Sequence, residues 1–205
     1  MTPSYWKQAA REIAARDAVL KKLITKFKGL ALGSRGDAFA TLARAIVGQQ
    51  ISVKAAQSVW TRLTADLAAV SPAAILRADT AQLRGCGLSG RKAIYLQDLA
   101  ARFHSGALDV ATWSQLGDEA LIDELTQVKG IGRWTAEMFL IFYMARPDVL
   151  PLDDIGLQRA IRLNYNHGKA LSRVKMRSIG NSWAPWRTVA TWYMWRSLDP
   201  IPVEY

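Results

Sequence analysis

Two short stretches of the sequence hold residue types that can do chemistry together. The first is "PLDDIGLQR", residues 151–159, in which Asp153 and Asp154 stand where a helix is expected to begin. The positive end of a helix dipole favours an ionised carboxylate, which can stabilise developing positive charge or orient an attacking water at neutral pH. Either residue can also be only a cap or a first-turn acid, and we expect that simpler role for Asp153.

The second stretch, "KGIGRW" at residues 129–134, is suited to binding an anion. Gly130 and Gly132 let the backbone turn without a Cβ in the way, and a helix starting near Arg133 points its unpaired N–H groups outward. Phosphate binds such helix ends, and Lys129 and Arg133 add positive charge. A dinucleotide-binding fingerprint is the competing interpretation, but it needs a third glycine and a preceding strand, and the preceding "DELTQV" has a helical pattern.

The elements that must position these residues are helices. Apolar residues recur at helical spacing through nearly the whole chain and alternating β-branched runs are missing, so we predict an all-α fold. Ser52, Ser71 with Pro72, and Asp118 stand where helix caps belong. The expected helices cover residues 5–26, 38–49, 52–69, 72–78, 80–85, 90–104, 118–127, 133–145, 153–164, 172–182 and 186–197.

One pattern occurs twice along the chain. Residues 81–96 and 126–140 each contain a short helix, a basic residue, Gly-x-Gly, further basic residues and a longer helix. The repetition indicates two corners that meet the same kind of partner. For the first copy the alternative stays open that its glycines merely end a helix.

Composition narrows the class of protein. The 205 residues include 27 Lys and Arg against 17 Asp and Glu, a formal net charge of +10, which favours a polyanionic partner such as nucleic acid or an acidic membrane. No apolar run approaches the roughly 20 residues that span a bilayer and no signal peptide is visible, so we expect a soluble, cytoplasmic protein. The single cysteine, Cys86, excludes an internal disulfide framework and an all-cysteine iron–sulfur cluster, and two histidines disfavour zinc.

Four motifs follow one another along the chain: "GQQISVKAA" at 48–56, "GIGRWTA" at 130–136, "PLDDIGLQR" at 151–159 and "WAPWRTVATWYMW" at 183–195. Together they resemble the motifs of the helix-hairpin-helix/Gly-Pro-Asp superfamily of DNA glycosylases, and within it the bacterial 3-methyladenine DNA glycosylase II group. The resemblance spans roughly residues 38–198. It implies one glycosylase unit over residues 1–205, with a first lobe of about 41–150, a second of about 1–40 with 151–205, and a cleft between them. Larger members carry an extra N-terminal α/β domain, for which this chain is too short.

The resemblance also implies roles for individual residues. Asp154 matches the catalytic aspartate. Trp134 holds the position at which strand-nicking members carry a Schiff-base lysine, so a monofunctional enzyme with water as the nucleophile is expected. Trp134 and Trp195 match walls of the base pocket, where an indole face attracts a positively charged alkylated purine. Two further pocket positions, tyrosine in the resembling group, are Met138 and Ile155 here, which predicts a less aromatic pocket.

Other positions are implied to contact DNA or a cation. Gln50 matches the wedge that fills the gap left by an extruded nucleotide, with capping of its turn by Gln49 and Gln50 as the alternative. Among the other tryptophans, Trp183 and Trp186 are expected in the core, and one of Trp192 and Trp195 is expected to pack inward. The DNA-backbone contacts implied are Lys129, Gly130, Gly132 and Arg133. The family's monovalent cation would be held by the backbone carbonyls of Thr126, Val128 and Ile131.

We therefore expect a monomeric enzyme that flips out and hydrolytically excises alkylated purines, of the 3-methyladenine and 7-methylguanine type, from double-stranded DNA. No cofactor is required beyond a possible Na⁺ or K⁺ at the hairpin, and no iron–sulfur cluster is expected. A catalytically silent helix-hairpin-helix module that only binds DNA is the alternative. A bifunctional glycosylase for oxidised bases is disfavoured by Trp134 and by the missing cysteines.

Overall fold

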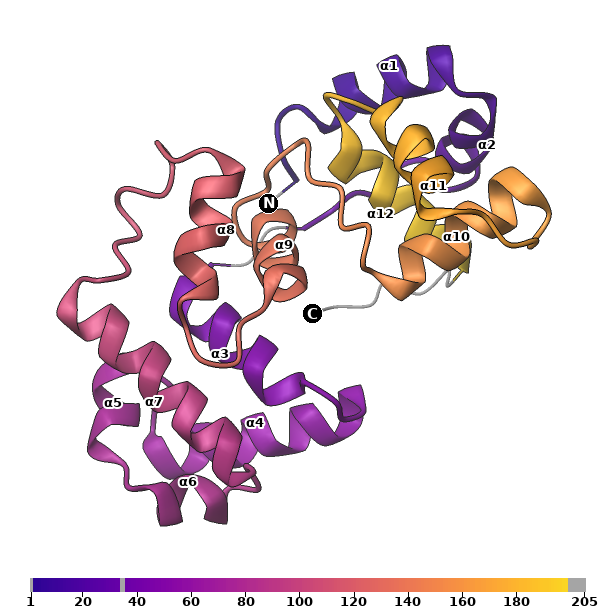
Figure 1. The fold of residues 1–205 in the computed structure, drawn as a ribbon. Coiled ribbons are helices and arrows are strands. Elements are labelled where there is room, and N and C mark those ends of the chain that lie inside the picture. The colour runs from indigo at the N-terminus through magenta and orange to yellow at the C-terminus, as the bar shows by residue number, and fades with distance from the viewer. Residues whose placement is uncertain (1, 34–35, 199–205) are drawn as a thin grey trace. The chain divides into compact units, whose positions relative to one another are not determined.

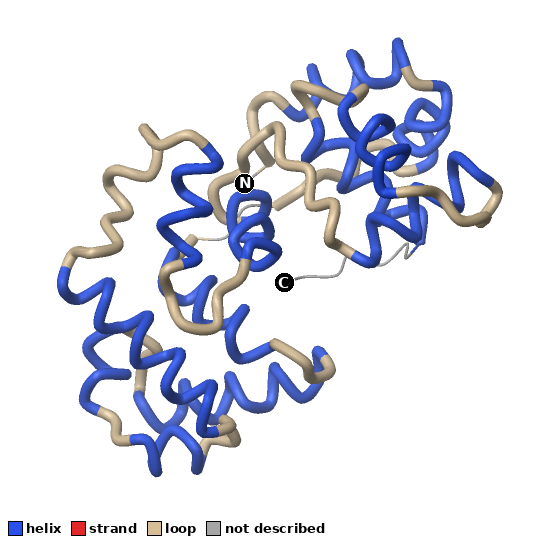
Figure 2. The backbone as a smooth tube through the Cα atoms, in the orientation of Figure 1, coloured by secondary structure: helices blue, strands red, loops and turns tan. Residues whose placement is uncertain are grey.

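The computed structural model describes residues 2–33 and 36–198, and within these ranges every regular element is an α-helix (Figures 1 and 2). The all-α prediction is confirmed. The helices are α1 (Trp6–Arg16), α2 (Ala18–Lys26), α3 (Ala38–Gly48), α4 (Val53–Leu67), α5 (Pro72–Arg77), α6 (Thr80–Gly85), α7 (Gly90–Ser105), α8 (Asp118–Thr126), α9 (Arg133–Phe142), α10 (Ile155–Asn166), α11 (Arg173–Asn181) and α12 (Arg187–Leu198).

The described residues form two compact units. One unit contains residues 2–33 and 140–198, and the other contains residues 36–139. The chain returns to the first unit inside α9, at residue 140, whereas the motif-based interpretation placed this return near residue 151.

Helix starts follow the capping chemistry read from the sequence. The Ser52 hydroxyl accepts the N–H of Ala55 at 3.2 Å at the start of α4, and the Ser71 hydroxyl accepts that of Ala74 at 3.3 Å at the start of α5. Both serine caps were predicted, and each satisfies a backbone donor that the helix itself cannot. Asp118 is not a cap, because it is the first helical residue of α8 and Gly117 precedes it.

The one long helix predicted over residues 5–26 is wrong, because Asp17 divides it into α1 and α2. Asp17 has an extended backbone, with φ −132° and ψ 109°, and its carboxylate accepts the N–H groups of Val19 and Leu20 at 2.9 Å each. Aspartate competes well with a continuous helix in this way, since its side chain replaces the backbone acceptors. The second carboxylate oxygen accepts the hydroxyl of Tyr165 at 2.6 Å, which joins this break to α10.

The core of the unit of residues 36–139 is a line of aromatic rings that meet edge to face. Phe39, Phe103, Trp113 and Phe139 follow one another with centroid separations of 5.3, 5.9 and 5.4 Å. Such pairs contribute about 0.5–1.5 kcal/mol each beyond the burial of their area. Helix α7, which carries Phe103, packs against α3 and α5.

The centre of the other unit is α12, which is buried on all sides. Residues 188–194 of α12 are all buried, and the helix packs against α1, α2 and α10 (Figure 1). A helix that is covered all round is held by its neighbours on every face, so its side chains have well-fixed positions.

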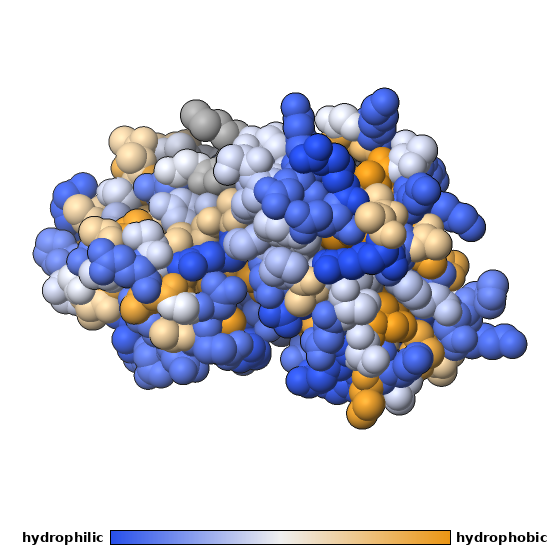
Figure 3. All heavy atoms as spheres, turned by 90° about the horizontal axis from the view of Figure 1, so that it is seen from above, coloured by the Kyte–Doolittle hydropathy of each residue, from blue (hydrophilic) through white to orange (hydrophobic). Residues whose placement is uncertain are grey.

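Hydrophilic side chains dominate the face drawn in Figure 3, and hydrophobic residues appear there in separate small patches. Among the described residues, no helix is both long and apolar enough to cross a membrane.

Candidate active site

Asp154 is the N-cap of α10 and is 7% exposed. Its Oδ1 atom accepts the backbone N–H of Leu157 at 2.6 Å and the indole N–H of Trp195 at 2.8 Å. Two N–H donors and the positive end of the α10 dipole therefore balance the charge of one nearly buried carboxylate. The structure brings together two of the residues predicted from the sequence, Asp154 and Trp195, which are 41 positions apart.

The indole of Trp195 is held in place by a second aromatic ring. Phe142 stacks on it with a centroid separation of 5.8 Å and an interplanar angle of 10°. Because one face of the indole lies against Phe142, the ring cannot rotate freely, and its N–H stays directed at Asp154. Trp192, one turn earlier, packs inward against Trp6 at 5.3 Å and 89°, as expected for one of this pair.

The other two tryptophans of this cluster differ from each other. Trp183 is 1% exposed, as predicted for a core residue. Trp186 is only half-buried, so the core prediction is wrong for this residue. Its ring stacks on Tyr5 at 5.7 Å and its N–H donates to Glu12 at 2.6 Å, because the indole has one polar edge that must find an acceptor.

Gly156 is a site residue that the sequence analysis missed. An added Cβ at this position would lie 3.1 Å from Oδ1 of Asp154 and 3.4 Å from Cδ1 of Trp195. Because Gly156 has only a hydrogen in place of a side chain, the carboxylate and the indole can approach each other across the first turn of α10. The available signal was a glycine placed directly after a helix start, where it lowers helix propensity by about 1 kcal/mol relative to alanine.

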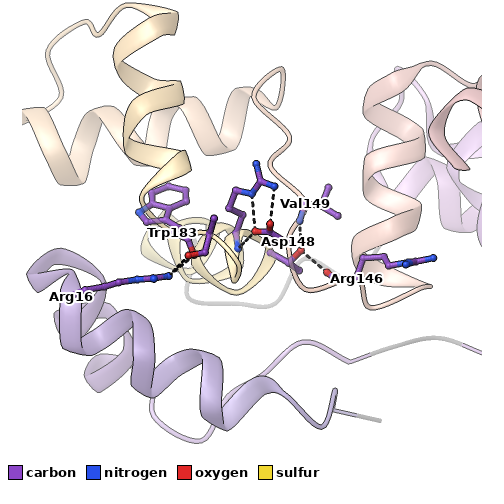
Figure 4. Close-up of polar contacts among 8 residues, drawn as sticks. Arg16, Arg146, Asp148, Val149 and Trp183 are labelled. Atoms are coloured by element: carbon purple, nitrogen blue, oxygen red, sulfur yellow. Dashed lines mark hydrogen bonds and ion pairs between the residues drawn. The ribbon is translucent and has the colours of Figure 1, made fainter. Parts of the chain in front are cut away.

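The loop that leads to Asp154 is fastened to α12 (Figure 4). The guanidinium of Arg187 donates to both carboxylate oxygens of Asp148, at 2.7 and 2.8 Å. The Thr188 hydroxyl donates to the carbonyl of Arg146 at 2.6 Å and accepts the N–H of Val149 at 3.0 Å. Because α12 also carries Trp195, the same helix positions the loop before the carboxylate and the ring that bonds it.

A third contact in Figure 4 fixes the turn before α12. Arg16, at the end of α1, donates from one guanidinium nitrogen to the carbonyls of Trp183 and Ala184, at 2.7 Å each. These carbonyls lie between α11 and α12, so the start of α12 is held from the side of α1.

Asp153 lies outside the helix and does not cap α10, because the cap is Asp154. It is exposed and forms an ion pair with Arg173 at 2.5 Å. An exposed pair of this kind contributes at most about 1 kcal/mol. The expectation that Asp153 has only a structural role fits this position, although the role is a surface ion pair.

The hairpin between α8 and α9 uses its two glycines differently. Gly130 has a left-handed backbone, with φ +82°, and an added Cβ would collide with the ring of Tyr95. This glycine is therefore required by the fold. Gly132 has no positive φ, and an added Cβ there would meet no heavy atom within 4 Å. The backbone at Gly132 is therefore open to a close approach from outside.

The two basic residues next to these glycines differ in their partners. Arg133 donates to both carboxylate oxygens of Glu119, at 2.8 and 2.6 Å, and to Glu137 at 3.0 Å. Hydrogen bonding with Glu119 raises the pKa of the guanidinium further above its already high value. Arg133 thus ties α8 to α9, and its charge is already balanced by carboxylates. Lys129 is exposed, and its backbone N–H donates to Asp98 at 2.9 Å.

The remaining predicted pocket residues occupy different environments. Trp134 is 38% exposed on α9, whereas Met138 on the same helix is 7% exposed. Ile155, the first residue of α10, is 79% exposed beside Asp154. An exposed aliphatic residue next to the carboxylate offers apolar surface to a ligand.

Gln50 is exposed in the turn between α3 and α4 and has a left-handed backbone, with φ +59°. Ser52 is the N-cap of α4, and Gln49 is the C-cap of α3, so the alternative that the glutamines cap this turn stays open for Gln49. Gln49 also donates its amide N–H to the carbonyl of Gly130 at 2.8 Å.

No cluster of three or more His, Cys, Asp or Glu side chains that could hold a metal ion is found in residues 2–33 and 36–198. Cys86 is a buried free thiol, and burial raises its pKa. A buried thiol of raised pKa is a weak nucleophile. Asp154, bonded to the indole of Trp195, stays the candidate for chemistry at this site.

Known proteins share both the sequence pattern and this fold. The family model of the HhH-GPD superfamily base excision DNA repair protein matches residues 43–185. DNA-3-methyladenine glycosylase 1 of Schizosaccharomyces pombe is 33% identical over 182 residues, covering 87% of this chain and 80% of the relative. The solved structure of a DNA-3-methyladenine glycosidase from Bacillus halodurans superposes with a TM-score of 0.85 at 34% identity, covering 93% of this chain and 89% of that one.

A second solved structure contains nucleic acid. The Schizosaccharomyces pombe 3-methyladenine DNA glycosylase in complex with abasic DNA superposes with a TM-score of 0.77 at 32% identity, covering 93% of this chain and 96% of that one. Residues 43–185, which the family model matches, include the hairpin, Asp154 and the turn with Gln50. This chain belongs to the HhH-GPD superfamily of base excision DNA repair proteins.

Proposed function

We propose that this protein is a DNA glycosylase that flips alkylated purines, of the 3-methyladenine and 7-methylguanine type, out of duplex DNA and excises them. The observation that carries the proposal is the nearly buried Asp154 carboxylate, held by the N–H groups of Leu157 and Trp195. The names of the relatives support the choice of alkylated bases.

The proposed chemistry needs one fixed negative charge. As the bond between the base and C1′ of the sugar breaks, positive charge develops on the sugar, and the Asp154 carboxylate stabilises it or orients the attacking water. A purine alkylated on a ring nitrogen already carries positive charge and leaves as a neutral base. It therefore needs little help from a general acid.

The positive charge of the alkylated purine also gives a physical basis for recognising the lesion. One face of Trp195 is covered by Phe142, so a cationic base would stack on the other face. A cation–π contact of this kind is worth about 0.5–2 kcal/mol, depending on how far the cation is desolvated.

We also propose that the enzyme lacks lyase activity. Schiff-base chemistry at the sugar requires an amine, and Trp134 follows the Gly-x-Gly-Arg segment where strand-nicking members of the family carry lysine. Water is then the nucleophile, and the product is an intact abasic site.

The hairpin is proposed to hold the phosphate backbone through main-chain donors at Gly132 and through the exposed Lys129. Arg133 stays proposed as a backbone contact, and it also joins α8 to α9 through Glu119. The proposed Na⁺ or K⁺ site would use the carbonyls of Thr126, Val128 and Ile131. Thr126 ends α8, where carbonyls lack helical partners, and the Val128 carbonyl, which accepts the Ile131 N–H at 3.0 Å, keeps a second lone pair.

Base release from methylated duplex DNA tests this function. We expect free 3-methyladenine in the soluble fraction, and abasic sites that become strand breaks only after alkali treatment. Strand breaks without alkali would refute the absence of lyase activity. Binding of the duplex without any base release would favour a module that binds DNA and does no chemistry.

A further inference from the structure

The turn between α3 and α4 is rigidly built around an exposed glutamine. Gln50 has φ +59°, a left-handed conformation that is unfavourable for a residue with a Cβ. Apolar side chains follow it, with Ile51 41% exposed and Val53 70% exposed. Something must hold this backbone, because otherwise the turn would relax to an unstrained conformation.

Lys92 supplies the first anchor. Its ammonium donates to the carbonyls of Val47 and Gln49, at 2.7 Å each. These carbonyls lie at the C-terminal end of α3, where helical partners are missing and positive charge is favoured. Lys92 stands in the first turn of α7, just after the first hairpin corner, and is only half exposed. Both acceptors therefore stabilise a cation that has lost part of its hydration.

Gln49 supplies the second anchor. Its side-chain amide donates to the carbonyl of Gly130 at 2.8 Å, inside the second hairpin. Gly130 is itself fixed by its left-handed φ and by the ring of Tyr95. The exposed glutamine is thus tied to both of the corners that the sequence repeats.

We propose that Lys92 and Gln49 are positioning residues for nucleotide extrusion, which hold Gln50 at a fixed place relative to the hairpin that grips the DNA backbone. This inference rests on the proposed function. Gln50 then enters the base stack without a further rearrangement of its turn. The turn and the hairpin move together as one rigid body when the protein binds DNA.

Two DNA duplexes distinguish a positioning role of Lys92 from a general effect on the stability of the protein. One carries the lesion in a normal pair, and the other carries the same lesion opposite an abasic-site analogue, where extrusion costs less. Lys92→Met keeps the apolar stem and removes both hydrogen bonds. We expect it to slow single-turnover base release about tenfold on the paired duplex, the low end for losing hydrogen bonds from a charged donor, and to change the rate on the unpaired duplex little.

Matched variants complete the test. Lys54→Met removes an exposed lysine from the first turn of α4 and should behave as wild type on both duplexes. Lys92→Arg retains donors and should recover most of the rate. Gln50→Ala keeps the Cβ and removes the wedge, so adding Lys92→Met to it should cause little further loss. Equal losses on the two duplexes, or additive losses in the double variant, would overturn the proposal.

A second readout does not depend on chemistry. 2-Aminopurine beside an abasic-site analogue fluoresces when it is unstacked, so wild type should raise its fluorescence on binding and Lys92→Met should raise it less at saturating protein. The same increase for both proteins would overturn the positioning role. Wild-type protein that raises the fluorescence but releases no base would instead refute the proposed function alone. Thermal melting of each variant confirms that it is folded.

Discussion

Replacing Gly156 with alanine should move stability and activity in opposite directions. The glycine lies in the first turn of α10 without a positive φ, so alanine should raise helix stability by up to about 1 kcal/mol. The new Cβ, however, would lie 3.1 Å from Oδ1 of Asp154 and 3.4–3.5 Å from the Trp195 ring. The contact with Oδ1 is tight by a few tenths of an ångström, whereas the contacts with the ring are ordinary van der Waals contacts, so the carboxylate must shift relative to the indole.

The expected loss of activity follows from that shift. A misplacement of about 1 Å in an active site can cost about 100-fold in rate, so a few tenths of an ångström predicts a loss of about three- to tenfold. Single-turnover base release measures the rate, and a thermal melt measures stability. Gly85→Ala, at the end of α6 with no heavy atom within 4 Å, is the matched control. Full activity of Gly156→Ala with a raised melting temperature would refute the reasoning that this glycine sets the geometry.

Three further predictions concern the supports of the site. Gly132→Ala should keep the melting temperature within a few degrees but weaken binding to undamaged duplex in a fluorescence titration. Gly130→Ala should lower the melting temperature, because its new Cβ would collide with the ring of Tyr95. The reverse pattern would contradict the assigned roles. Thr188→Val removes two buried hydrogen bonds and should destabilise the protein by about 2 kcal/mol in urea denaturation, and a loss below about 0.5 kcal/mol would show that the loop is held by other contacts. Glu119→Gln removes the main partner of Arg133 and should tighten DNA binding more at low salt than at high salt; unchanged affinity at every salt concentration would mean that the guanidinium stays with its helix partner.

Local chemistry made much of the fold predictable. The serine caps at Ser52 and Ser71 and the helical spacing of apolar residues depend on neighbours within a few positions, and the structure contains both caps. Asp154 was placed at a helix start for the same reason. The break at Asp17 was missed because an amphipathic pattern continues on both sides of it, and only the extended backbone and the bond from Tyr165 distinguish a cap from a surface aspartate.

The features of the site that the sequence did not reveal come from contacts between distant residues. The sequence did not show that Arg133 pairs with Glu119, which lies 14 positions earlier on another helix. The bond from Lys92 to Val47 joins residues 45 positions apart. Helical periodicity fixes which face of a helix is buried but not which polar groups meet across helices, so such pairs cannot be read from one sequence.

The central claim is that the Asp154 carboxylate carries the reaction, and Asp154→Asn tests it most directly. Asparagine caps a helix as well as aspartate does, so the melting temperature and the affinity for abasic-analogue duplex should change little. Asp153→Asn is the matched control, because that carboxylate is exposed and paired with Arg173. We predict that single-turnover release of 3-methyladenine falls by about 100-fold or more in Asp154→Asn and stays near wild type in Asp153→Asn. Release by Asp154→Asn at the wild-type rate would contradict the account.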